Sequence, residues 1–574
     1  MLILDLRYNG NMDEEASILF NQISYDKRNY FNQIVTQLSK KFIDDVDWWA
    51  EGPASRNVYS SPLFHYVCCF FLVEKMVSQK KLKYEEIIVD CKDFFIILNN
   101  FFNDNNIIKK IKIRHRDNFI KRTVLKPFFL STILFLKIFL RFLSARFTKN
   151  HRSENKINNL ILVDTYMLPN YVNEDRWYGE FWNNLDISQK NQVHFVPTIV
   201  MTSVFSYLNV FNKLRNNKRN FLIKEDFLKY IDIIWSFRSR KRLKNKVIDP
   251  IYILEYNFSP LIKNELLNNT DFLTVIESLL TYKFIKRIKK SKLDIKLVIN
   301  WFEGQSIDKM WNLGFKDFYP TVKKIGLRGG GDFPFALCSF PISIEQEAGV
   351  LPDIFAVQGK GSIATVSEFL KNIDIIVVPS FRSLHVWNEI KYIQTKDNYV
   401  NILVTLPIMV SVANRIIKLI LEISQSVLIL NSNIKFLIKT HPACRLDKEY
   451  HCLKNKFPDN VILSSENSFP KLIRQTRILI SEASSTCLES LAIGVPVIVI
   501  NNNSGLTHNP IPNTISNYLY KLVHTRNELF NAIHYYINSN IIIENQQKIE
   551  AEKIRNLYFE PMSKYGLNLF LNIK

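Results

Sequence analysis

Short apolar runs that stop at polar residues recur along the chain and predict buried parallel β-strands. They cover residues 159–164, 193–197, 297–302, 324–328, 353–359, 373–378, 401–406, 434–439, 477–480 and 497–500. Two further runs, residues 1–5 and 87–90, lie near the N-terminus. Helix-like segments such as residues 411–425 alternate with the runs. This alternation predicts an α/β protein with parallel sheets, and we expect two Rossmann-like domains that face each other across a cleft.

The strands predicted at residues 434–439 and 477–480 both lead into residues suited to binding an anion. The first runs into His441 and Pro442, and because proline cannot donate to a sheet ladder, His441 is expected at the carboxyl end of the strand. The second is followed by hydroxyl residues 484–486 and a helix-like segment. Free N–H groups and the positive end of the helix dipole converge at such a helix start. The pattern therefore predicts a phosphate-bearing ligand at this edge of the sheet.

These two motifs resemble the nucleotide-binding half of GT-B glycosyltransferases. The resemblance is carried by Lys439-Thr440-His441-Pro442, by Ser-Glu-Ala-Ser-Ser-Thr at residues 481–486 and by Glu-Ser-Leu-Ala-Ile-Gly-Val-Pro-Val at residues 489–497. Within that class the chain most resembles bacterial enzymes that use CMP-activated acid sugars, namely Kdo transferases and polysialyltransferases, and the related polyglycerolphosphate transferases. The resemblance implies a glycosyltransferase of capsule, O-antigen or lipopolysaccharide synthesis. It implies a nucleotide sugar and a glycan or lipid-linked glycan as substrates, and neither a metal nor another cofactor.

The resemblance also implies that His441, Ser484 and Ser485 hold the phosphate and cytidine of the donor. With their neighbours, the predicted donor site consists of Lys439, His441, Pro442, Ser484, Ser485, Thr486 and Glu489. We expect Glu489 to contact the ribose or the base, although a glutamate early in a helix is also favourable because of the helix dipole. The alternative for His441 is a histidine that only caps its strand.

A carboxylate follows the strand predicted at residues 297–302. Glu303 stands immediately before Gly304, which allows a ligand or a helix to approach closely. CMP-sugar polysaccharide transferases carry an acidic pair before a glycine in their first domain, whereas here the pair is Phe302-Glu303, so one carboxylate remains. We assign general acid/base catalysis to Glu303. The alternative is that Glu303 only orders its loop.

Further polar residues near predicted strand ends and in polar loops are candidates for binding the acceptor or its sugar. They are Arg56, Asn57, Asp164, Asp175, Arg176, Gln305, Arg328 and Glu345. Arg56 follows a tryptophan pair and offers a bidentate fork to a carboxylate or phosphate, but its loop also fits a packing role anchored by the tryptophans. Arg328 enters a glycine-rich turn that lacks the Lys-Ser/Thr of a P-loop.

Residues 128–143 form the most hydrophobic segment of the chain. They are too few to span a membrane comfortably, and Lys137 and Arg141 interrupt them with the i, i+4 spacing of one helical face. Further basic residues flank the segment on both sides. One interpretation is a helix lying on an anionic membrane surface, and the other is a buried amphipathic helix between two parts of the first domain.

The charge and the cysteines narrow the choice of partners and compartment. The 574-residue chain has a net charge of +21, which favours anionic partners, and we expect a nucleotide sugar and its glycan rather than nucleic acid. Its seven cysteines show no zinc-type spacing, and their odd number argues against a disulfide framework. The N-terminus does not resemble a signal peptide. We therefore expect a cytoplasmic protein, peripheral on the inner face of the cytoplasmic membrane if the apolar segment is interfacial.

The domain organisation expected from these patterns has five parts. They are an N-terminal α/β region (1–125), a basic apolar linker helix (126–155), the remainder of the acceptor domain (156–390), a nucleotide-sugar-binding Rossmann-like domain (400–545) and C-terminal helices that return to the first domain (546–574). Three alternatives to the CMP-sugar transferase remain open. They are a UDP-sugar epimerase-like enzyme, a polyglycerolphosphate transferase-like enzyme and a noncatalytic membrane-surface scaffold.

Overall fold

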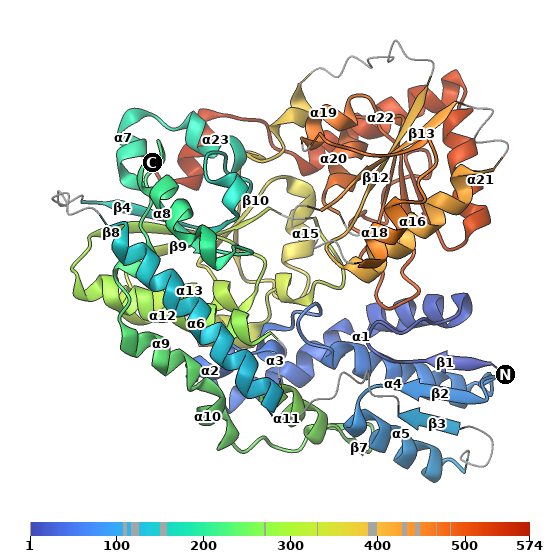
Figure 1. Cartoon of the computed structure of the whole chain (residues 1–574), viewed down its shortest axis with the longest axis horizontal. Coiled ribbons are helices and arrows are strands. Elements are labelled where there is room, and N and C mark those ends of the chain that lie inside the picture. Colours follow the sequence, from blue (N-terminus) through green and yellow to red (C-terminus); the bar gives the residue numbers. More distant parts are fainter. Residues whose placement is uncertain are drawn as a thin grey trace.

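The computed structural model describes residues 2–106, 112–115, 125–149, 158–268, 271–329, 331–388, 399–426, 433–441, 448–466, 468–482 and 484–573. Within these residues the chain forms two six-stranded sheets, a three-stranded sheet and a small hairpin, with helices packed around them (Figure 1). The fold is the predicted α/β fold with two Rossmann-like domains. The predicted linker at residues 391–399 lies almost wholly outside the described residues.

The first six-stranded sheet contains every strand predicted between residues 159 and 378. Its order is β11-β10-β9-β8-β4-β5, and all neighbours are parallel. The strands are β4 (Leu160–Met167), β5 (Val193–Ile199), β8 (Ile295–Trp301), β9 (Lys323–Arg328), β10 (Ile354–Val357) and β11 (Asp374–Val377). Their mostly apolar side chains are buried on both faces, because helices such as α12 (Phe272–Lys290) and α13 (Ser306–Phe318) cover the sheet. The strand order reverses between β4 and β8.

The second six-stranded sheet contains the strands that carry the donor motifs. Its order is β14-β13-β12-β15-β16-β17, again all parallel. The strands are β12 (Val400–Thr405), β13 (Ile434–Lys439), β14 (Val461–Leu463), β15 (Ile478–Ser481), β16 (Val497–Ile500) and β17 (Tyr520–Val523). Its helices are α16 (Val410–Ser424), α18 (Lys448–Lys454), α19 (Phe469–Ile473), α20 (Thr486–Ala492) and α21 (Arg526–Ile537). Here the order reverses between β12 and β15, the arrangement of a dinucleotide-binding fold.

The N-terminal unit is a three-stranded parallel sheet with its own helices. The strands are β1 (Ile3–Asp5), β2 (Glu86–Val89) and β3 (Lys112–His115), and the longer helices are α1 (Glu14–Lys40), α4 (Leu63–Ser78) and α5 (Lys92–Asp104). This unit touches the second sheet's domain directly. The amide of Met12 donates to the carbonyl of Asn503 (2.9 Å), and the amide of Thr507 donates to the Asn21 side chain (2.8 Å).

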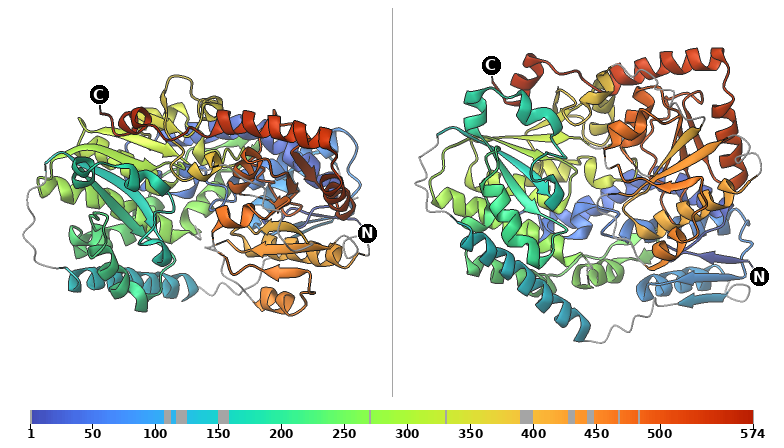
Figure 2. Two further views of the ribbon diagram at one scale, coloured as in Figure 1. Left: turned by 90° about the horizontal axis from the view of Figure 1, so that it is seen from above. Right: turned by 45° about the horizontal axis from the view of Figure 1, so that its top comes forward.

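The last helices join the two six-stranded units. Helix α22 (Ile541–Tyr558) packs against α20 of the second domain, and the chain then returns to the first domain (Figure 2). The amide of Glu560 donates to the carbonyl of Gln358 (2.6 Å), and its carbonyl accepts from the amide of Ser380 (2.9 Å). Phe570 of α23 (Lys564–Phe570) packs in the core of the first sheet against Phe181.

The apolar segment 128–143 lies in helix α6 (Leu125–Phe147), and one of its two basic residues points into the protein. Arg141 is only 5% exposed and forms ion pairs with Glu277 (2.6 Å) and Glu225 (2.9 Å). Arg141 therefore anchors α6 to the core of the first domain. No helix within the described residues is long and apolar enough to cross a membrane.

Candidate functional site

A tight turn after β4 carries Arg176, one of the predicted acceptor residues. The carboxylate of Asp175 accepts the amides of Trp177 and Tyr178, both at 2.8 Å, and pairs with Arg219 at 2.7 Å. The Trp177 ring donates its N–H to the carbonyl of Tyr166 (2.8 Å). Asp175 is thus occupied in shaping the turn, while the Arg176 side chain is directed away from it.

Gly179 fixes this turn against the segment that follows β11. Its φ is +47°, and a Cβ there would lie 2.4 Å from the carbonyl oxygen of Phe381. The neighbouring amide of Glu180 donates to the same oxygen at 3.0 Å. Only glycine allows this approach, which brings Arg382 beside the turn that carries Arg176.

Arg176 meets the donor motif of the other domain. Its guanidinium lies 3.3 Å from Nε2 of His441, which follows β13. Because arginine is always a donor, Nε2 accepts and the ring is neutral. Burial, followed by the charges of Arg176, Lys439 and Arg382, lowers the pKa of His441 from 6.5 to about 4. The carboxyl ends of the two sheets are therefore in contact at a site rich in positive charge.

We call Arg176, Arg382, Lys439 and the neutral His441 the cation cluster, and the charges of this cluster also act on Arg176 and Lys439. Burial and then Arg382 lower the pKa of Arg176, with Glu303 opposing the shift. Burial and then Arg176 lower the pKa of Lys439. Half-buried cations that destabilise one another's charge form a ready site for an anion, which would relieve the repulsion. The cluster also lies at the end of β4, where the first sheet changes strand order and where α/β proteins bind ligands.

The hydroxyl motif of the second domain lies at the start of α20. Ser484 Oγ is 2.6 Å from Thr486 Oγ1, and both side chains remain partly exposed, as does Ser485. Further along the helix, Glu489 is buried and its carboxylate lies 3.2 Å from Nε2 of His385. Burial lowers the pKa of His385, and Glu489 opposes this shift. Glu489 therefore already contacts a protein group, whereas the hydroxyls remain accessible. Pro442 lies outside the described residues.

Glu303 follows β8 on the opposite side of the strand-order reversal from Arg176. Its Oε1 accepts the indole N–H of Trp301 (2.8 Å), and its Oε2 accepts the amide of the Gln305 side chain (2.6 Å). The carboxylate is half-buried and held by both donors. Its electrostatic influence on Arg176 links it to the cation cluster.

Two buried carboxyl groups support the Glu303 loop. Asp308 accepts the backbone amides of Glu303 and Gln305, both at 3.0 Å, and the Tyr166 hydroxyl at 3.4 Å. Burial raises the pKa of Asp308 well above its usual value, and the charges of Glu303 and Asp164 raise it further. Asp164 is fully buried 3.6 Å from Lys224, and burial raises its pKa as well. Asp164 therefore lies beneath the site and does not line it.

Four other predicted acceptor residues, Arg56, Asn57, Arg328 and Glu345, are committed to protein contacts. Arg56 is buried, and its guanidinium pairs with Glu345 at 2.9 Å and donates to the carbonyl of Phe340 at 2.7 Å. Arg328 is buried and donates to the carbonyl of Ser339 at 2.6 Å. Asn57 accepts the amide of Tyr59 at 3.0 Å and shapes its own loop. The structure does not bring these residues to the cation cluster.

Sequence reasoning missed Arg382, His385 and Asp308. Arg382 and His385 both follow the predicted strand at residues 373–378. Basic residues just beyond a strand end could have indicated that these two side chains contribute to the site. The role of Asp308, holding the backbone amide of Glu303, depends on a loop conformation that no spacing rule predicts.

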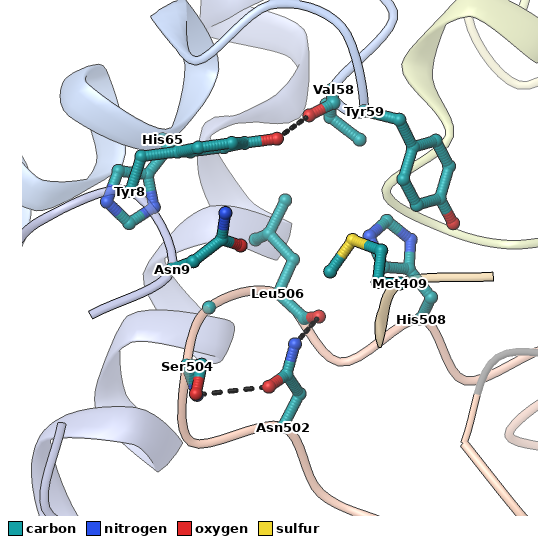
Figure 3. A pocket seen from close by; sticks show the side chains of 11 residues that line it. Tyr8, Asn9, Val58, Tyr59, His65, Met409, Asn502, Ser504, Leu506 and His508 are labelled. Carbon is teal, nitrogen blue, oxygen red and sulfur yellow. Dashed lines mark hydrogen bonds between the residues drawn. The ribbon is translucent and has the colours of Figure 1, made fainter. Parts of the chain in front are cut away.

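A separate cavity lies where the N-terminal unit meets the second domain (Figure 3). It is lined by Tyr8, Asn9, Val58, Tyr59, His65, Met409, Asn502, Ser504, Gly505, Leu506 and His508. The His508 ring stacks on Tyr59 with 4.6 Å between centroids, and burial lowers the pKa of His508 to about 4. The lining is therefore uncharged at neutral pH. Burial raises the pKa of Tyr59, and the charges of Glu482, Cys338 and Glu303 raise it further.

Comparison with known proteins yields structural similarity without sequence similarity. No protein-family model matches the chain, and no curated protein matches it in sequence. The UDP co-structure of MnaA from S. aureus is 12% identical and covers 72% of this chain and 98% of its own, with a TM-score of 0.43. UDP-forming trehalose-phosphate synthase from Burkholderia vietnamiensis is 8% identical and covers 70% of this chain and 96% of its own, with a TM-score of 0.41. The glycosyltransferase SnogD from Streptomyces nogalater is 11% identical and covers 72% of this chain and 98% of its own, with a TM-score of 0.39. The chain's own sheet orders define a GT-B-like α/β protein with two Rossmann-like domains.

Proposed function

We propose that this protein is a glycosyltransferase whose nucleotide-sugar donor binds with its phosphate between Arg176 and His441. The observation that carries the proposal is the 3.3 Å contact of these two side chains, which come from different sheets and lie among further cations. An anionic group there would neutralise repulsion that the protein otherwise bears. The partly exposed hydroxyls of Ser484 and Thr486 supply neutral donors on the second domain.

The donor class that we propose is a CMP-activated acid sugar such as Kdo, with a surface-polysaccharide glycan as acceptor. The support is the resemblance of the His441 and Ser484–Thr486 motifs to enzymes of that class, together with the surplus of positive charge. An acid sugar adds a carboxylate to the phosphate, and a cluster with two arginines suits two anionic groups.

In this proposal Glu303 accepts the proton of the acceptor hydroxyl. The hydroxyl oxygen forms a bond to the anomeric carbon, the bond from that carbon to the phosphate oxygen breaks, and CMP leaves with the electron pair. Arg176 and Lys439 neutralise the leaving phosphate. Hydrogen bonds from Trp301 and Gln305 hold the Glu303 carboxylate in one orientation, and Asp308 holds its backbone amide. Asp308 acts as a positioning residue.

A UDP-sugar epimerase-like enzyme is the second candidate, because carboxyl groups at the end of the first sheet also suit proton exchange with a sugar ring. UDP-N-acetylglucosamine 2-epimerases are among the structurally similar proteins. The other two alternatives are a polyglycerolphosphate transferase-like enzyme and a noncatalytic membrane-surface scaffold. No specific side-chain contact in the described residues favours either of them.

Titration of the whole protein with CMP, UMP and UDP in a calorimeter and in a thermal-shift assay tests the proposal. We expect CMP to bind and to raise the melting temperature, and Arg176→Ala to weaken the binding and reduce the rise in melting temperature. Arg238→Ala, which removes an exposed cation on another face, is the matched control. Selective binding of UDP would favour the epimerase, and failure of all three nucleotides to bind would overturn a sugar-nucleotide function.

A further inference from the structure

The inner face of helix α6 is fixed by packing and by one buried ion-pair cluster. Ile138, Phe142 and Ala145 are buried against the first domain. Arg141, on the same side, pairs with Glu277 and Glu225. Removing one partner of a buried pair leaves an uncompensated charge, so the helix cannot rotate without a large loss of stability. The opposite face of α6 is thereby forced outward.

That outward face is apolar. Leu130, Ile133, Leu136 and Leu140 are between 44% and 56% exposed, and they recur at intervals of three or four residues along one side of the helix. Phe147 continues the line and is also exposed. Helix α6 runs along the outer edge of the molecule (Figure 2), so no other described element covers this side.

Neighbouring elements extend the apolar surface. Helix α6 contacts η3 (Val204–Ser206), α8 (Tyr207–Arg215) and α9 (Tyr230–Phe237). These elements expose Phe205, which is 94% accessible, and also Leu208, Tyr230, Ile231 and Ile234. The Tyr230 ring packs 4.8 Å from that of Phe142, which joins α9 to α6. We call the exposed apolar residues of α6, η3, α8 and α9 the apolar face.

The segments that carry the apolar face expose charges of one sign. Within the described residues 125–149 and 200–246, the acids are Glu225, Asp226 and Asp232, and each pairs with an arginine, respectively Arg141, Arg215 and Arg287. The exposed charged residues of these two segments are all cations: Arg146, Lys213, Lys218, Lys229, Arg238, Lys241 and Lys244. An apolar surface whose own segments expose only cations is complementary to an anionic lipid bilayer.

We propose that the apolar face docks on an anionic membrane, with the side chains of Leu130, Ile133, Leu136 and Leu140 at the headgroup boundary. The surrounding lysines and arginines contact lipid phosphates. A second copy of the chain is a poorer occupant, because it would place the same cations opposite one another. The inference does not depend on the identity of the donor, so it stands or falls separately from the proposed function.

Co-sedimentation of the whole protein with lipid vesicles tests this docking. We expect binding to vesicles that contain phosphatidylglycerol and little binding to phosphatidylcholine alone. Leu136→Glu with Leu140→Glu should weaken binding by at least about tenfold, since two leucines lose their burial in lipid. Ile541→Glu with Ile542→Glu is the matched control, because both isoleucines are exposed on another helix. It should bind as wild type does.

A second variant tests the contribution of the basic residues to vesicle binding. Lys229→Gln with Lys241→Gln should weaken binding to the anionic vesicles by about fivefold for each lost charge. The melting temperature of each variant verifies folding. Wild-type protein that ignores anionic vesicles at moderate salt would overturn the proposal. An equal loss of vesicle binding in the control variant would also overturn it. So would a dimer detected by light scattering, if Leu136→Glu with Leu140→Glu converted that dimer to a monomer.

Discussion

A buried group and a half-buried group of charged side chains in this molecule are built in opposite ways. In the core cluster, Arg56 and Lys309 share the carboxylate of Glu345 at 2.9 and 2.7 Å. Burial alone would raise the pKa of Glu345, but Arg56 and Lys309 lower it below its usual value. In the cation cluster, Arg176 instead lies beside His441, and Lys439 and Arg382 add further positive charge.

This difference in charge pairing separates residues that stabilise the fold from residues that we propose bind a ligand. In the core cluster, Glu345 stabilises the positive charge of Lys309 against the effects of burial and of Arg56, which lower the pKa of Lys309. In the cation cluster, burial first and then neighbouring cations lower the pKa values of Arg176, Lys439 and His441. Perturbed groups of this kind collect at functional sites. Arg56 and Arg176 were both predicted as acceptor ligands, and only their partners distinguish them.

The largest expected effect is on the core cluster. Arg56→Ala should lower the free energy of unfolding by about 3–5 kcal/mol, because it leaves part of a buried network unpaired. Urea denaturation measures the loss. Arg477→Ala is the control, since Arg477 pairs with Glu544 near the surface at 2.7 Å and such pairs contribute about 0–1 kcal/mol. Equal losses in the two variants would contradict a structural role for Arg56.

The next effect is on turnover rather than on stability. Glu303→Gln keeps the shape of the side chain but removes the charge, and we expect turnover to fall at least about a hundredfold. Donor binding and melting temperature should stay close to those of wild type. If Glu303 only orders its loop, the variant would instead lose stability and keep its rate.

Arg176→Ala should act in the opposite sense to Arg56→Ala. We expect nucleotide affinity to fall by about 1.5–3 kcal/mol, the contribution of a hydrogen bond to a charged group. Stability without ligand should be unchanged or slightly higher, because the variant removes one of several like charges. Arg176→Lys, which keeps the charge but loses the fork, should restore part of the affinity. Calorimetry with the nucleotide that binds wild type measures both. A clear loss of stability in Arg176→Ala would place Arg176 with the structural residues.

The sequence predicted the sheets far better than it predicted the partners of the polar side chains. Buried strands are apolar runs, so β4, β8, β13 and β15 could be predicted from hydropathy. The position of Arg176 opposite His441 depends instead on how two domains meet. The burial of Arg141 in α6 could not be predicted for a related reason. Lys137 and Arg141 are spaced as one helical face, but Glu225 and Glu277, distant in the sequence, draw Arg141 into the core.

The smallest expected effect compares two histidines that share a low pKa for different reasons. Burial alone lowers the pKa of His508 to about 4, whereas at His441 the nearby cations act in addition to burial. In both cases the unfolded chain takes up a proton near the ordinary pKa of 6.5 before the folded chain does. Stability is therefore fully present above that value and is lost as the pH falls toward 4. At about pH 5.5 each histidine should lower the free energy of unfolding by about 1 kcal/mol.

Urea denaturation at about pH 7.5 and pH 5.5 measures how much the free energy of unfolding falls with pH. This fall should be smaller in His441→Gln and in His508→Gln than in wild type. A bound nucleotide sugar sharpens the comparison, because its phosphodiester stays ionised over this range. Negative charge beside His441 favours the imidazolium, so the ligand should reduce the acid sensitivity that His441 contributes. His508 faces a cavity whose lining is uncharged, and its contribution should not respond to the ligand. A ligand that changed both contributions equally would show that the anion does not bind at the cation cluster.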